Sequence, residues 1–160
     1  MKKLLITSLL AGLLAMITSA FAATRAEVIA AAKAEIPAGV FMYDYKEDAS
    51  QKYVTEIKFR DPKTLLDYEV EVDRTIAKVL EVEIKGSNDA KSTTLVKTHD
   101  DIEKIILAEY PDAQKLVIKL EQDRNRYEYE ATFTTPKYFE VELELNPVTG
   151  AIAKRELKYR

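Results

Sequence analysis

The tetrapeptides AEIP (34–37) and AEYP (108–111) stand 74 residues apart and decide how the chain is divided. The same offset relates further identical residues: Thr24 and Thr98, Tyr53 and Tyr127, and Phe59 and Phe133. After one deletion, an offset of 73 places YEVEVD (68–73) over VELELN (141–146). A register that is kept over so many positions predicts an internal duplication.

Each copy begins with the signals of a helix. A threonine stands three residues before an acid, which is typical of an N-terminal capping box: Thr24 with Glu27, and Thr98 with Asp101. The proline of each tetrapeptide ends the helix, because proline has no amide hydrogen to donate. We therefore predict helices over about 25–36 and 99–110.

After each proline the hydrophobic period changes from about 3.6 to 2, which indicates strands. The alternating segments are 53–59, 68–72 and 80–84 in the first copy, and 116–120, 127–133, 139–145 and a short strand from Ala151 in the second. The prediction is an α+β fold of two tandem repeats, each with one N-terminal helix packed on a three- to four-stranded antiparallel sheet. The repeats span 23–85 and 95–160, and the polar segment 86–94 is interpreted as a linker.

The first 22 residues resemble a secretory signal peptide. Lys2 and Lys3 precede an uncharged apolar run from Leu4 to Ile17, and Ala20-Phe21-Ala22 fits the small-x-small rule for cleavage before Ala23. The apolar run is shorter than the roughly 20 residues that span a bilayer. We expect a periplasmic or secreted bacterial protein that keeps no membrane anchor after cleavage.

Composition excludes several classes of function. Without the leader, 22 Lys and Arg residues face 27 Asp and Glu residues, so nothing favours a nucleic-acid partner. The chain has no Cys and one His, His99, which lies at the start of the second predicted helix. A hydrolase would need His99 as its base, and we favour instead a solvated first-turn residue. No phosphate loop or metal-spaced His pair is present, so we expect no catalysis, no cofactor and no metal site.

The second copy resembles the PepSY domain. That family reads helix, proline, alternating strand, Y-x-V-x-V and then D-x-x-T-G-x-I/V, and the second copy ends with Asn146, Thr149, Gly150 and Ile152 in the matching places. The first copy has Asp73, but Ile76-Ala77 replaces Thr-Gly. The doubled, exported arrangement is also similar to the tandem repeats of the beta-lactamase inhibitor protein.

This resemblance implies a non-catalytic, exported binding module. PepSY domains occur in propeptides of thermolysin-type peptidases, which they restrain, and in envelope proteins. The implied partner is an exported protein, with a peptidase or another enzyme as the candidate class. The alternative is an envelope protein that binds a small ligand or a cation.

The segment VFMYDYK (40–46) is the first candidate binding site. The repeat places Phe41, Tyr43 and Tyr45 over residues that point to water, which would make them a partner-binding patch. Local alternation predicts the opposite, with the three aromatic residues facing inward and Asp44 facing outward. We favour burial on this pattern, since a regular strand has only one phase.

Acidic residues on the water-facing phase of the strands form the second candidate site: Glu69, Glu71, Glu140, Glu142 and Glu144. Such a face could bind a basic partner or calcium. We favour a solvated face whose charges are offset by neighbouring cations, for which the candidates are Lys58, Arg60, Lys119 and Lys137.

Overall fold

The computed structural model describes residues 22–47 and 53–160. The expected leader, apart from Ala22, lies outside the described residues. The elements follow the order α1 (Arg25–Ala34), β1 (Phe41–Glu47), β2 (Val54–Arg60), β3 (Asp67–Asp73), β4 (Lys78–Lys85), α2 (His99–Glu109), β5 (Gln114–Asp123), β6 (Arg126–Thr134), β7 (Tyr138–Leu145) and β8 (Ile152–Tyr159).

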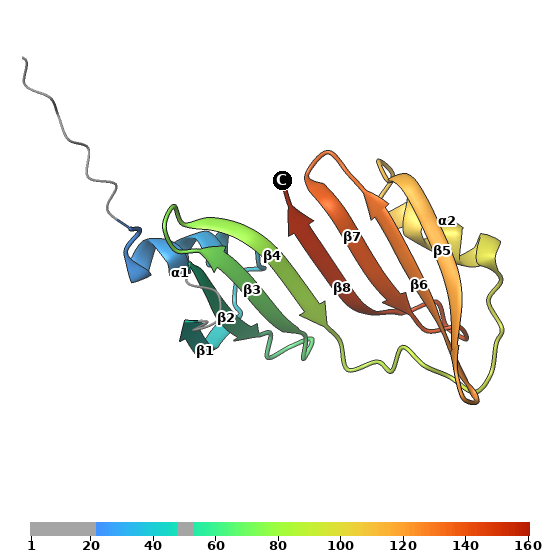
Figure 1. Cartoon of the computed structure of the whole chain (residues 1–160). Helices are drawn as coiled ribbons and strands as arrows, with labels where there is room; N and C mark the ends of the chain where they lie inside the picture. Colours follow the sequence, from blue (N-terminus) through green and yellow to red (C-terminus); the bar gives the residue numbers. More distant parts are fainter. Residues whose placement is uncertain (1–21, 48–52) are drawn as a thin grey trace, which may run out of the picture.

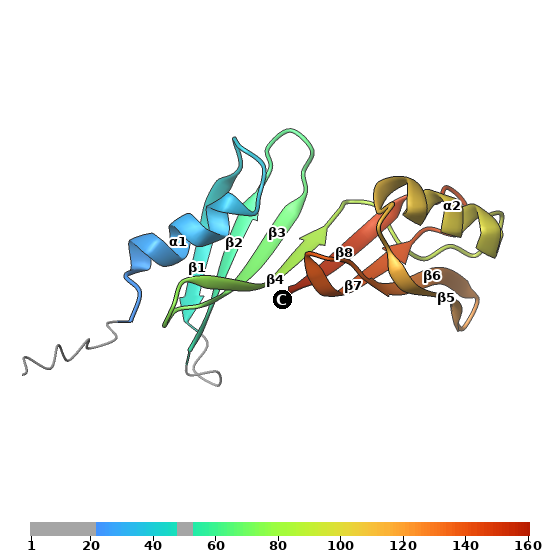
Figure 2. The same cartoon turned by 90° about the horizontal axis from the view of Figure 1, so that it is seen from above.

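These strands form one eight-stranded antiparallel sheet with the order β1-β2-β3-β4-β8-β7-β6-β5. The α+β class is therefore confirmed, and the strands share a single sheet in which β4 pairs with β8. Both helices lie on the same face of this sheet, α1 over its first half and α2 over its second half (Figures 1 and 2). In the part of the chain that the structure describes, no helix covers the opposite face.

Both predicted capping boxes form. The Thr24 side chain accepts the amide of Glu27, whose carboxylate accepts the Thr24 amide at 2.7 Å. Thr98 and Asp101 make the same reciprocal pair, with a Thr98 amide to Asp101 distance of 3.0 Å. The helices end at Ala34 and Glu109, just before the positions predicted from the two prolines.

One hydrophobic core runs under both helices. Val28 and Ala32 of α1, and Ile102 and Ile106 of α2, are fully buried against alternate residues of the strands. The core continues across the middle of the sheet, where Val82 of β4 pairs with Leu157 of β8. Burial of alternate residues in β2, β3 and β7 is what the period of 2 predicted.

The glutamates of the two tetrapeptides both contact β8. Glu35 accepts a hydrogen bond from the Tyr159 hydroxyl at 2.7 Å and pairs with Lys137 at 2.8 Å. Glu109 accepts three hydrogen bonds from the Arg155 guanidinium, two of them to the same carboxylate oxygen at 2.9 and 3.0 Å. The C-terminal ends of both helices are thus tied to the strand at the joint between the halves.

The inward orientation predicted for the aromatic residues of β1 is wrong for Phe41 and Tyr43, which are 49% and 51% exposed. Met42 pairs with Phe59, and Asp44 pairs with Lys58, so Tyr43 between them is an extra residue. This β-bulge changes the phase of the strand, because one inserted residue reverses the face of all that follow. Tyr45 consequently faces the core and is half-buried.

The segment 86–94, interpreted as a linker, makes specific contacts. Ser92 pairs with Tyr127 in a backbone bridge, and Arg126 pairs with Asp89. Lys91 lies 3.1 Å from Glu128, which is only 8% exposed. The segment follows the end of the sheet from β4 to the β5–β6 hairpin before it reaches α2 (Figure 1).

Gly150 and Ala77 occupy the turns before β8 and β4. Both have left-handed backbones, with φ of 76° and 51°. A Cβ on Gly150 would also lie 2.4 Å from the Ile105 Cδ1 atom of α2. Alanine at position 77 therefore holds a conformation that glycine adopts without steric cost.

We expect opposite effects from exchanging these two residues. Gly150→Ala should lower the free energy of unfolding by about 1–2 kcal/mol, the cost of a left-handed conformation for a residue with a Cβ. Ala77→Gly should leave stability unchanged or raise it, because it removes the same cost while making the unfolded chain more flexible. Urea denaturation measures the free energy of unfolding of both variants. A Gly150→Ala variant as stable as the wild type would contradict the cost expected for a Cβ at this left-handed position.

Candidate partner-binding edge and the charged sheet face

The edge strand β1 exposes three consecutive large apolar side chains. Phe41 and Tyr43 are about half exposed and Met42 is 37% exposed. The rings of Phe41 and Tyr43 contact edge to face, with centroids 6.5 Å apart. We define Phe41, Met42 and Tyr43 as the aromatic edge.

Two arginines flank the aromatic residues of β1. The Arg60 guanidinium lies 5.8 Å from the ring centroid of Tyr43, and that of Arg25 lies 4.2 Å from the ring centroid of Tyr45. Cation–π contacts of this kind hold aromatic rings in fixed orientations. Rigid aromatic side chains beside arginine are the residue types that dominate binding energy at protein interfaces.

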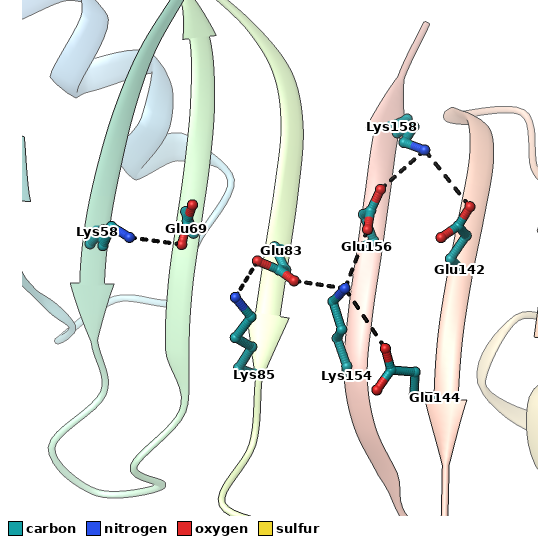
Figure 3. Close-up of polar contacts among 9 residues, drawn as sticks. All are labelled: Lys58, Glu69, Glu83, Lys85, Glu142, Glu144, Lys154, Glu156 and Lys158. Carbon is teal, nitrogen blue, oxygen red and sulfur yellow. Dashed lines mark hydrogen bonds and ion pairs between the residues drawn. The ribbon is translucent and has the colours of Figure 1, made fainter. Parts of the chain in front are cut away.

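The helix-free face of the sheet carries charged side chains in cross-strand rows, and lysines in these rows contact carboxylates of neighbouring strands. Lys58 of β2 bonds Glu69 of β3 at 3.0 Å. Lys154 of β8 lies 2.8 Å from Glu83 of β4 and 3.8 Å from Glu144 of β7. The contact between Lys154 and Glu83 connects the two halves of the sheet across the β4–β8 joint (Figure 3).

The acidic residues named from the sequence all lie on this face, but not as one bare cluster. Besides Glu69 and Glu144, Glu140 and Glu142 lie 2.6 and 3.8 Å from Lys158. Glu71 is opposite Glu56 and Glu81 in the neighbouring strands. Lysine ammonium groups therefore lie beside four of the five named carboxylates, as is typical of a solvated sheet face, whereas Glu71 stands between two other glutamates.

Sequence reasoning missed the two lysines that matter most here, Lys154 and Lys158. Of the cations proposed instead, Lys58 pairs as expected, whereas Lys137 pairs with Glu35 on the helix side. Burial lowers the pKa of Lys154, but the hydrogen bond to Glu83 and the surrounding carboxylates outweigh it and raise the pKa above its ordinary value. The signal was present, since Lys154, Glu156 and Lys158 alternate with period 2 in the last strand.

His99 lies in the first turn of α2 and is exposed, as the sequence indicated. Its ring nitrogen and the carboxylates of Asp100 and Glu103 lie within 4.8 Å of one another. All three side chains are in water, and exposed acidic groups commonly gather in this way.

Comparison with known families found a match in the second half of the chain. Residues 97–156, from the approach to α2 through most of β8, match the PepSY model, described as "Peptidase propeptide and YPEB domain". The resemblance drawn from the sequence is thereby confirmed for this segment. PepSY domains are generally non-catalytic propeptide or regulatory modules, typically extracellular or periplasmic.

A solved structure of the Bacillus megaterium YpeB C-terminal domain is similar, with a TM-score of 0.44 and 14% identity. The similarity covers 84% of this chain and 63% of that one. A comparison with curated proteins found no match. Within residues 22–47 and 53–160, no helix is both long and apolar enough to cross a membrane.

Glu81 is the carboxylate of the charged face whose proton affinity is most altered. It is directly opposite Lys158, yet the Lys158 ammonium lies 2.6 Å from Glu140 and 3.0 Å from Glu156. Burial, together with the nearby charges of Glu156 and Glu71, raises the pKa of Glu81 to about 7. The folded protein therefore holds this proton more tightly than the unfolded chain does.

This shift predicts a pH dependence of stability. Because the pKa rises on folding from 4.5 to about 7, the contribution of Glu81 is fully present below pH 4.5 and is lost as the pH rises through 7. The stability of the wild type relative to Glu81→Gln should fall over this window and level off above it. Urea denaturation from pH 4 to 8 measures the difference in the free energy of unfolding between the wild type and Glu81→Gln. The Glu140→Gln variant, measured in the same way, is the control. A pH-independent difference for Glu81→Gln would show that the proton affinity is unaltered.

Proposed function

We propose that the protein is an exported, non-catalytic binding module that captures another exported protein through the aromatic edge. The observation that carries this proposal is the exposure of Phe41, Met42 and Tyr43 on a free edge strand. Contiguous apolar side chains on a surface mark sites of protein–protein contact. Among the described strands, the open edge of β1 also presents backbone groups that pair with no strand, and these can add to the affinity for an extended partner segment.

We further propose that the two halves are repeats of one PepSY-like unit. Residues 74 apart hold corresponding places, since Val28 and Ile102 are both buried under their helices and Phe59 and Phe133 are both buried in their strands. The family match covers the second half, so the assignment of the first half depends on these correspondences. Two units joined in one sheet present a wider surface than either unit alone.

A peptidase, or another exported enzyme, is the partner class that we favour. The support is the family description, which names peptidase propeptides, and the regulatory role common to PepSY domains. Export is inferred from the leader expected over residues 1–22, with cleavage before Ala23. The protein would then act in the periplasm or outside the cell.

Capture of a partner tests this function. The purified protein, used as bait in an extract of exported proteins, should retain one specific enzyme, and inhibition of that enzyme's activity should accompany binding. Phe41→Ala and Tyr43→Ala should each weaken binding by about 1–4 kcal/mol if they are hot spots. Phe139→Ala is the matched control, because Phe139 is 48% exposed but lies on β7.

Two outcomes would contradict the proposal. Equal loss of binding in Phe139→Ala would show that the aromatic edge is not the site. Retention of no specific protein, together with a rise in melting temperature on adding calcium, would favour the alternative of a cation-binding envelope protein, because a ligand stabilises the state that binds it.

A further inference from the structure

Among the described strands, β1 and β5 are the two edges of the sheet, and a free edge can pair with another strand. On β1, the backbone N–H of Tyr45 donates a hydrogen bond to the side chain of the preceding residue, Asp44, at 2.8 Å. The N–H groups of an edge strand point alternately to the neighbouring strand and to the open edge. The Tyr45 N–H therefore faces the open edge, where the Asp44 carboxylate covers it.

We propose that, while no partner protein occupies its open edge, β1 pairs antiparallel with β1 of a second copy of this chain, about a two-fold axis at Tyr45, so that dimerisation competes with the capture proposed above. In this register, Asp44 of each copy is opposite Lys46 of the other, and the two Tyr45 residues are opposite one another. The neighbouring symmetric register, centred on Asp44, would place two carboxylates opposite each other. Like charges in that position destabilise a strand pair, so the charges select the register centred on Tyr45.

The Asp44 carboxylate has a different partner in the monomer and in the dimer. Asp44 and Lys46 are both exposed, and within their own sheet they are opposite Lys58 and Glu56 of β2. When a second copy approaches, its Lys46 attracts the Asp44 carboxylate away from the Tyr45 N–H. That N–H then donates to the Tyr45 carbonyl of the second copy, and the reciprocal bond forms at the same time.

The aromatic edge favours β1 over β5 as the contact. Phe41, Met42 and Tyr43 directly precede the paired segment and would lose exposed apolar area in the dimer. The other edge begins at a bulge with the left-handed residue Lys115 and ends in the polar run 121–123. Strand pairing over so few residues covers less than a standard interface of about 1,600 Å², so the dimer should depend on concentration.

Sedimentation velocity over a range of concentrations tests the dimer. The wild type should change from monomer to dimer as its concentration rises. Asp44→Lys and Lys46→Asp should each raise the dissociation constant at least about tenfold, because each places like charges in opposite positions. An equimolar mixture of the two variants should form a heterodimer. In that mixture one chain carries lysine at both positions and the other carries aspartate at both, so each opposed pair again joins unlike charges.

The heterodimer also shows that both variants remain folded. Lys119→Glu on β5 is the matched control and should leave the dimer unchanged. The proposal is overturned if the wild type stays monomeric at every soluble concentration, if the mixture stays monomeric, or if only Lys119→Glu dissociates the dimer. A monomer whose capture of an exported enzyme is weakened by Asp44→Lys would show that the edge takes a partner strand instead.

Discussion

The pairing of β4 with β8 is the constraint on which the rest of the structure depends. Five residue pairs, from Glu81 and Lys158 to Lys85 and Lys154, join strands that are separated by most of the second half of the chain. Because this pairing is antiparallel and in register, the alternation of side chains continues across it. The helices consequently share one face and one core, while the charged rows share the other.

At the β4–β8 joint, residues of like charge are directly opposite each other, an arrangement that destabilises a strand pair. Glu83 is opposite Glu156, and Lys85 is opposite Lys154, so two like-charged pairs stand next to each other. The conflict is resolved diagonally, since Lys154 contacts Glu83 across the joint and also Glu156 on its own strand. A shift of register would break these diagonal contacts and turn the core face outward, which makes the register of the joint specific.

Much of the fold could be predicted because its signals are local. The capping residues, the two prolines and the period of 2 placed both helices and the strands within a few residues of their observed bounds. The joint could not be predicted, because no local pattern reports which edge strands meet when the partners are about 75 residues apart. In the candidate site, Phe41 and Tyr43 were named from their aromatic alternation, but their orientation was wrong because the bulge at Tyr43 carries no compositional signal. Lys154 and Lys158 alternate with Glu156 in the last strand, but their partners Glu83 and Glu140 lie on β4 and β7, whose pairing with β8 no local pattern reports.

The place of β8 in the sheet has a consequence for how the chain acquires its structure. It is the last strand in chain order, yet it lies in the middle of the sheet between β4 and β7. During synthesis, the first four strands therefore precede β8, and β4 is then an open edge of the sheet. The exposed face of that edge carries Glu81, Glu83 and Lys85, charges that discourage premature pairing with other chains. Arrival of β8 closes the sheet and places Arg155 and Tyr159 against both helices in one step, so the halves should gain their final stability together rather than one after the other.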